Sequence, residues 1–287
     1  MITESEARIY ADEISSKASI TAIAVAAMAI AAYVINVCAY TFGVYNFFIA
    51  ILISSIISLY IFAVIHDASH HSLIPSNRKV NDLIGGIFAF LLNWNFQSFK
   101  EIHQQHHIHA HSKKDPDLIY SEQGKTKSLI VVPTLLVFLR IFIVLPKSIR
   151  NRINKQFKNK IKVYVYLYQK DKRQCRVYRF NFFLTVFSVI FFGFGSIVLF
   201  CYISSIVFMY LIHPLVSWIP HMTKFDRSEE AVNKYKTARK YNFRFNSFLL
   251  FPAHNHLEHH LFPQVQFTRL NNFSSVIKPI VYKNLEI

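Results

Sequence analysis

Two long stretches of this chain contain no charged side chain, and they limit its fold more than any other feature. Residues 18–65 lack Asp, Glu, Lys and Arg over 48 positions, and residues 180–223 lack them over 44. A helix needs about 20 apolar residues to cross a bilayer, so each stretch is long enough to cross twice. The core helix of a soluble protein needs no uncharged run of this length. We therefore predict an integral, multi-pass membrane protein with an all-α fold.

Four transmembrane helices are expected, arranged as two hairpins. The first hairpin should contain spans at about 18–40 and 44–65, and the second should contain two spans within 180–220. An even number of spans returns the chain to the side on which it started. The excess of Lys and Arg near the span ends assigns that side, with both termini, to the cytoplasm.

Two shorter apolar segments are not expected to cross the membrane. Residues 83–94 form an apolar run of only 12, which suits a re-entrant or interfacial helix. Residues 128–146 contain Arg140 and are interrupted by Pro133 and Pro146, so we expect them to lie in the interface with Arg140 reaching the headgroups. The polar remainder should form a cytosolic helical cap within a single domain. The cap comprises residues 66–127, 147–179 and 221–287 of a domain that covers 1–287.

The positive charge of the chain is concentrated in one segment. The net charge is +16, and residues 147–179 contain twelve Lys or Arg against one acid, Asp171. A cytoplasmic segment that flanks the membrane and faces anionic lipids accounts for this pattern. A docking surface for an acidic electron donor or acyl carrier is the alternative. Nucleic-acid binding is not expected, because no nucleic-acid-binding motif accompanies the charge and the segment lies beside membrane spans.

The N-terminal residues and the cysteines point to no further processing or cross-linking. Four acids within residues 1–17 are incompatible with a cleavable signal peptide, which begins with positive charge. Cys38, Cys175 and Cys201 are far apart and odd in number, so neither a disulfide framework nor a cysteine metal site is expected.

Histidines gather in three clusters near the ends of the predicted spans. Twelve of the 14 lie in the segments 66–71 (HDASHH), 103–111 (HQQHHIHAH) and 254–260 (HNHLEHH). On a helix, positions i, i+3 and i+4 share one face, so the HxxHH pattern in the second and third clusters directs three imidazoles to one point. His66 and His70 are also four apart, whereas His71 would point about 100° away from His70 on a helix. The choice between His70 and His71 is open at this stage.

Eight or nine imidazoles exceed the ligand number of one metal ion. A tetrahedral zinc takes four ligands, and imidazole also suits copper, iron and nickel, so the count implies two metal ions side by side. The chain lacks the Glu-x-x-His pairs of soluble carboxylate-bridged di-iron bundles and the HExxH of zinc proteases. Neutral imidazole ligands leave the metals strongly positive, which suits the binding and activation of oxygen.

The three clusters together resemble the histidine boxes of the membrane fatty-acid desaturase superfamily. HDASHH, HQQHH and HLEHH occur in this order, with Asp115-Pro116-Asp117 after the second and Leu261-Phe262-Pro263 after the third. The superfamily includes related hydroxylases and carotenoid ketolases, and the resemblance runs from about residue 66 to residue 263. It implies a four-span protein whose cytosolic cap holds two Fe ions, with O2 as co-substrate. It also implies a fatty acyl substrate carried on lipid, CoA or acyl carrier protein, and an external electron donor such as ferredoxin or a cytochrome.

The resemblance also implies a set of nine metal ligands. Carried over residue by residue, the set is His66, His70, His103, His106, His107, His221, His256, His259 and His260. His221 is preferred to His213 because Trp218-Ile219-Pro220-His221 resembles the Pro-His element that follows the last span in the family. The extra histidines and the nearby acids are expected to surround the ligands or to face solvent. They are His71, His109, His111, His254, Asp67, Glu101, Asp115, Asp117 and Glu258.

The predicted function is oxygen-dependent desaturation of a long fatty acyl chain. Hydroxylation and carotenoid ketolation are the alternatives, since members of the same superfamily carry them out with similar boxes. A His-rich metal transporter is a third possibility, but transport calls for ionisable residues inside the spans. Residues 18–65 and 180–223 contain no acid and no Lys or Arg, which disfavours transport.

Overall fold

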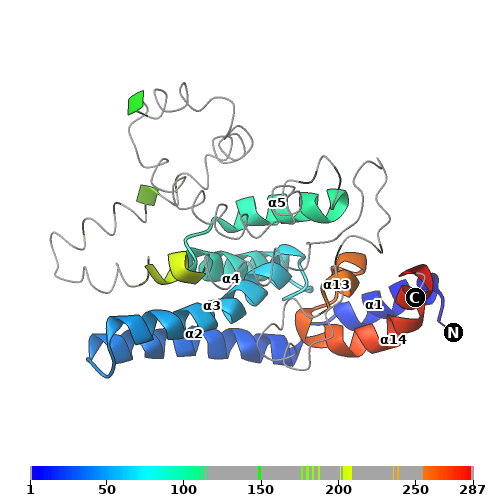
Figure 1. Ribbon diagram of the computed structural model, residues 1–287. Helices are drawn as coiled ribbons and strands as arrows, with labels where there is room; N and C mark the ends of the chain where they lie inside the picture. The colour runs from blue at the N-terminus through cyan, green and yellow to red at the C-terminus, as the bar shows by residue number, and fades with distance from the viewer. Residues whose placement is uncertain are drawn as a thin grey trace.

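The computed structural model describes the N-terminal part of the chain up to the second histidine box, and the third box with the C-terminal helix that follows it. The described residues are 2–110, 112, 115, 148–149, 176, 179–180, 183, 187, 201, 203–208, 235, 238 and 255–285. Regular secondary structure in this part of the chain is helical, without a strand, which confirms the all-α prediction (Figure 1). The predicted segments 128–146 and 147–179, and the two spans within 180–220 apart from the scattered positions above, lie outside the described residues.

The first predicted hairpin is present as two long apolar helices. Helix α2 spans Ile20–Thr41 and helix α3 spans Phe47–Ser69, with mean hydropathies of 2.2 and 2.7. Ser19 and Asn46 cap their N-termini by accepting hydrogen bonds from backbone N–H groups. Gly43 adopts a φ of +72° in the connection, a left-handed conformation that glycine accepts without strain. Both helices are long and apolar enough to cross a membrane, and their bounds match the first two predicted spans within a few residues.

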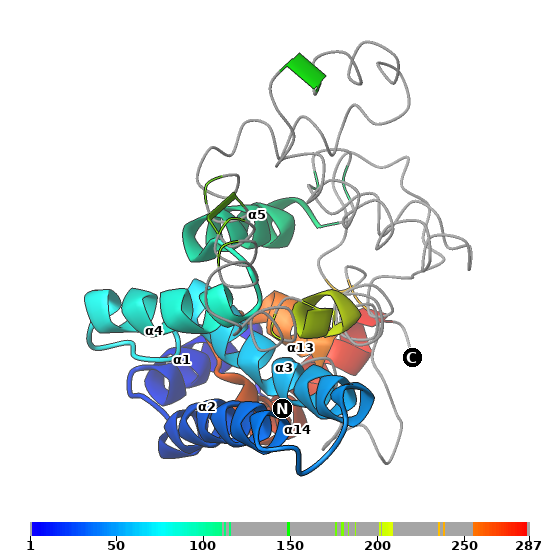
Figure 2. The same cartoon turned by 90° about the vertical axis from the view of Figure 1, so that its left-hand side faces the viewer.

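Two shorter helices stack on α3 and carry the chain to the second histidine box. Helix α4 spans Arg78–Leu91 and helix α5 spans Phe96–His109. The four helices lie in the order α2, α3, α4, α5 from bottom to top in Figures 1 and 2. A Cβ atom added at Gly85 would lie 2.4 Å from the Phe96 ring and 2.9 Å from Ala68, so the missing side chain permits this close stacking.

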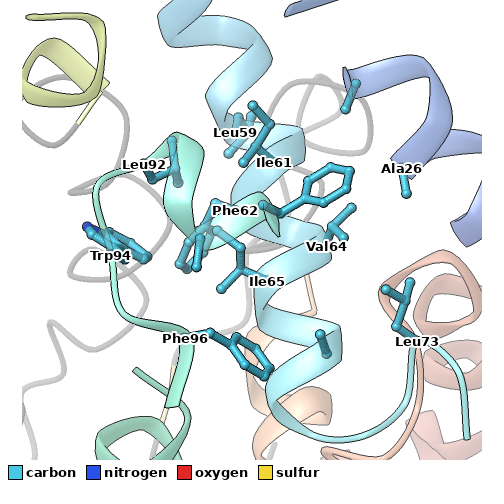
Figure 3. Packing of buried hydrophobic residues seen from close by; sticks show 14 of the residues in the cluster. Ala26, Leu59, Ile61, Phe62, Val64, Ile65, Leu73, Leu92, Trp94 and Phe96 are labelled. Atoms are coloured by element: carbon cyan, nitrogen blue, oxygen red, sulfur yellow. The ribbon is translucent and has the colours of Figure 1, made fainter. Parts of the chain in front are cut away.

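The core beneath the first box is apolar and aromatic. Phe62 of α3 contacts Trp94 and Phe99 with ring centroids 5.8 and 6.0 Å away, and Figure 3 shows the surrounding aliphatic side chains. Phe208 also packs against Phe62 at 6.3 Å and is fully buried. Part of the second apolar stretch therefore packs onto the first hairpin.

One face of α4 is apolar and exposed. Val80, Leu83, Ile87 and Phe90 are exposed and recur at the three- and four-residue spacing of one helix face. The helix lies where the sequence predicts an interfacial or re-entrant segment, and its location relative to the bilayer stays a prediction.

A second core lies between the two ends of the described chain. Helix α1 spans Glu4–Ser15, the short helix α13 spans His256–Leu261, and helix α14 spans Phe267–Leu285. Helices α1 and α14 lie side by side, with α13 close to α14 (Figure 1). Our sequence analysis assigned no helix to residues 4–15. The signal was present, because Thr3 and Glu6 form a reciprocal capping box.

Candidate metal centre

The first box lies where α3 ends. His66 is in the last turns of the helix, and His70 is its C-cap residue with φ −91° and ψ 5°. His71 then takes a φ of +57°, which turns its ring away from His70 and towards the carboxylate of Asp82, with Nδ1 and Oδ1 3.4 Å apart. The structure therefore places His66 and His70 together and separates His71 from them.

The second and third boxes are on helices, as their spacing predicts. His103, His106 and His107 lie in the last turns of α5. The third box lies on the six-residue α13: His256 is its first residue, and His259 and His260 are in its last turn. Each HxxHH pattern therefore presents its imidazoles from a single short stretch of helix.

Five imidazoles from the three boxes converge on one point. One ring nitrogen from each of the five lies within 4.8 Å of the others; they belong to His66, His70, His103, His107 and His259. The Nε2 atom of His107 lies 3.1 Å from that of His103 and 3.1 Å from that of His259. Ligand nitrogens bound to one tetrahedral metal at about 2.0–2.1 Å lie about 3.3 Å apart, so this spacing suits coordination.

The remaining described box histidines lie next to this group. The Nε2 atoms of His256 and His260 are 3.2 Å apart. The ring of His260 lies 4.4 Å from that of His107 and 5.0 Å from that of His106, measured between centroids. His107 therefore contacts both groups of imidazoles, an arrangement that leaves room for two metal positions side by side.

Burial favours the neutral form of four of the imidazoles in this site. Burial, and then the neighbouring imidazoles, hold the pKa of His70, His103 and His259 well below the usual value of 6.5. The pKa of His107 is lowered well below that value for the same reasons, and His260 has the largest effect among the neighbouring imidazoles. Neutral imidazole is the form that binds a metal ion, so the group is ready to act as a ligand set near pH 7. The Nε2 atom of His70 is buried and has no hydrogen-bond partner among the described residues, as expected of a nitrogen that faces a metal.

In two of the boxes, a carboxylate lies near the Nδ1 atom of a histidine. Asp115 lies 2.9 Å from Nδ1 of His106, and both side chains are buried. Asp67 lies 4.0 Å from Nδ1 of His66, and both of its oxygens are 3.3 Å from the backbone N–H of Phe267. Asp115 is close enough to accept a hydrogen bond from the His106 ring, which orients that ring and raises its basicity. Asp67 is too far from Nδ1 of His66 for a hydrogen bond and is held instead by the backbone N–H of Phe267.

The other two described acids differ from each other. Glu258 is fully buried within the third box and accepts a hydrogen bond from Ser274 of α14 at 2.8 Å. Glu101 is exposed and accepts a hydrogen bond from Gln97 at 3.1 Å. Of the two, only Glu258 is part of the box.

Several predicted positions lie outside this group. His109 is described at the end of α5 and is not among the five convergent histidines. His111, His213, His221, His254 and Asp117 lie outside the described residues, so the predicted ninth ligand, His221, stays a prediction.

The sequence analysis missed two polar contacts that support the site. Lys100 is buried beside the second box, and its Nζ lies 2.9 Å from Oδ2 of Asp82, the carboxylate that faces His71. Gln266 is fully buried and donates its side-chain amide to the backbone carbonyls of Ser72 and Lys17. No local pattern in the sequence marks either contact, because the partners are 18 to 249 residues apart.

The fold and the site together define a class of protein: a helical chain with two membrane-length apolar helices and a buried polyhistidine site able to hold metal. A family model described as "Fatty acid desaturase" matches residues 40–286. The chain therefore belongs to the fatty acid desaturase family, as its three boxes predict. A search of curated proteins finds no significant match. Members of the family are membrane-associated oxidoreductases that typically hold two irons with histidines, and the histidine cluster of this chain is compatible with that site.

Proposed function

We propose that this protein is a membrane-bound fatty acyl desaturase with two irons. The observation that carries the proposal is the meeting of eight box histidines, which come from three segments as far apart as residues 66 and 260, in one buried site. In the reaction, a –CH2–CH2– unit of the acyl chain becomes –CH=CH– and loses two hydrogen atoms. One O2 takes up these two hydrogens, two electrons from an external donor and two protons, and leaves as two water molecules.

The described donor set fits two irons. His66, His70, His103, His107 and His259 would hold one, and His106, His256 and His260 would contribute to the other, together with His221. When bound, the irons supply the reduction of O2 and the removal of hydrogen from an unactivated methylene. All nine predicted ligands are imidazoles and none is a carboxylate, so bound irons would keep the positive charge that favours an electron-rich oxygen molecule.

The protein contributes position and exclusion of water. His66, His103, His106, His256 and His259 are all buried, so bulk water has little access to the reacting carbon. An apolar slot between the spans would hold the alkyl tail, and its shape would select the methylene that is presented. Asp115, which lies within hydrogen-bond distance of Nδ1 of His106, maintains the orientation of that ring.

The orientation of the protein follows from the same proposal. Four spans would place the site and both termini on the cytoplasmic face, with membrane lipids around α2 and α3. An electron donor such as ferredoxin or a cytochrome would deliver electrons there, and the basic residues 147–179 are the proposed docking segment.

Expression in a host without such enzymes, followed by mass spectrometry of its lipids, tests the reaction. We expect acyl chains two mass units lighter than the host's own, with a double bond at one position. His103→Ala should abolish this product, whereas His109→Ala, on the same helix but outside the convergent group, should retain it. A hydroxylated chain or an oxidised carotenoid without a new alkene would instead support the hydroxylase or ketolase alternative.

A further inference from the structure

A cavity of about 350 Å³ lies between α1 and α14, and none of the box histidines lines it. Its lining residues are Tyr10, Glu13, Ile14, Lys17, Arg269, Asn272 and Phe273. This volume is at the lower end of the range for small-molecule sites, about 300–1,000 Å³. The family match begins at residue 40, so the part of the cavity formed by α1 lies outside the matched region.

The cavity is next to the beginning of the first candidate membrane helix. Lys17 precedes the N-terminus of α2 at Ile20 by three residues. Ile20 is 85% exposed and Ile23 is 45% exposed, so the first turn of α2, which follows Lys17 in the chain, presents an apolar surface. If α2 lies in the bilayer, its first turn is at the level where hydrocarbon meets headgroups.

The charged side chains in the cavity are complementary to a ligand that carries both a phosphate and an ammonium group. Lys17 and Arg269 supply two positive charges and Glu13 supplies one negative charge. Arg269 is held in place because its Nη1 donates to the backbone carbonyls of Lys17, at 2.8 Å, and of Ile14. Tyr10 and Phe273 stack with centroids 5.9 Å apart and form an aromatic wall.

The side chains of Glu13 and Lys17 are not paired with each other. Glu13 and Lys17 are four residues apart on the same stretch of chain, a spacing at which ion pairs are common on helices. Among the described residues, however, the side chains of Glu13 and Lys17 form neither this ion pair nor any other hydrogen bond. Two opposite charges are therefore available to a ligand that itself carries both signs.

We propose that this cavity binds the headgroup of one phospholipid from the surrounding bilayer. Lys17 and Arg269 bind its phosphate, Glu13 binds the ammonium of an ethanolamine-type headgroup, and the acyl chains run along the exposed isoleucines of α2. The proposal rests on the membrane location of α2, which is part of the proposed function, but it does not depend on the reaction at the metal site.

Native mass spectrometry of the full chain, released from nanodiscs with equal amounts of phosphatidylethanolamine and phosphatidylglycerol, tests the site. We expect retention of one phosphatidylethanolamine in preference to phosphatidylglycerol. Lys17→Met should weaken retention about tenfold, the expected effect of losing one charge-assisted hydrogen bond. Glu13→Gln should remove the preference between the two lipids, and Lys283→Met, an exposed cation at the far end of α14, should change neither.

The remaining outcomes separate the two proposals. A reconstituted protein that retains no lipid, or equal amounts of both lipids in wild type and variants, would overturn the headgroup site alone. If inorganic phosphate displaces the lipid and binds as tightly as the lipid does, the cavity is a site for free anions. That result would also overturn the headgroup site. A chain that stays in the aqueous fraction instead of entering nanodiscs would overturn both the headgroup site and the proposed membrane topology.

Discussion

The core around α3 and the core between α1 and α14 hold the metal site from two sides, but with different kinds of contact. Around α3, long apolar and aromatic side chains such as Phe62 and Trp94 fill the space between uncharged helices. The core between α1 and α14 is also apolar, but polar contacts such as Gln266 to Ser72 and Thr268 to Ser19 flank it. The first and second boxes belong to the α3 side, and the third box belongs to the α14 side.

The difference shows how the metal site is assembled. A long apolar helix can be stable in a bilayer by itself, since its backbone hydrogen bonds are satisfied within the helix. The six-residue α13 cannot, because so short a helix is not stable without tertiary packing. The third box is therefore held in position by α14, through Glu258 to Ser274 and Asn255 to Asn271. Four predictions test this division, in decreasing order of expected effect.

The largest effect is expected where the two sides meet. His259 of the α14 side has its Nε2 3.1 Å from that of His107 of the α3 side. His259→Ala should therefore abolish product formation and lower the iron content of the purified protein, measured by inductively coupled plasma mass spectrometry. His109→Ala should keep both close to wild type. Full iron content and activity in His259→Ala would contradict the ligand assignment.

A large loss of stability is expected from the α14 core. Phe273 is fully buried against Tyr10 and Phe262. Phe273→Ala should lower the free energy of unfolding by about 3–5 kcal/mol, the usual effect of removing a buried aromatic ring. Thermal unfolding in detergent, followed by circular dichroism, measures it. Ile9→Ala, on the exposed side of α1, should change stability by less than about 0.5 kcal/mol.

A moderate effect is expected from the contact that joins the two sides. Gln266→Met keeps the length of the side chain and removes the amide that bonds to Ser72 and Lys17. We expect a loss of about 1–3 kcal/mol, because buried carbonyls lose their donors. Gln264→Met is the matched control, since the hydrogen bond that Gln264 makes within the described part of the chain is an exposed one with Asp12 at 3.1 Å. Equal stability of the two variants, measured by urea unfolding, would mean that Gln266 does not join the cores.

The smallest effect is expected at the start of α1. Thr3→Ala removes one half of the capping box with Glu6. The cost should be about 1 kcal/mol of helix stability, without loss of iron. Hydrogen exchange of the first turn of α1 would reveal it. Unchanged protection there would contradict a role of the cap in the stability of α1.

The sequence predicted the parts of the site but not how they are joined. Helical spacing correctly placed His103, His106 and His107 on one helix, because the spacing of side chains along a helix is a local property. The same reasoning could not choose between His70 and His71, since the choice depends on the left-handed φ of His71 after the helix ends. Helical spacing also could not predict the contacts of Lys100 and Gln266, because their partners are distant in the sequence.

What the amino-acid sequence determined by itself was the kind of structure and chemistry available. Uncharged stretches of 48 and 44 residues indicate helices in an apolar environment. Three histidine clusters supply side chains that can bind metal. The tertiary structure decided which nitrogens face one another, which carboxylates support them, and which helix holds the third box. These outcomes depend on burial and on contacts between residues far apart in the sequence, such as Asp67 with Phe267, 200 positions away, and no local pattern encodes either.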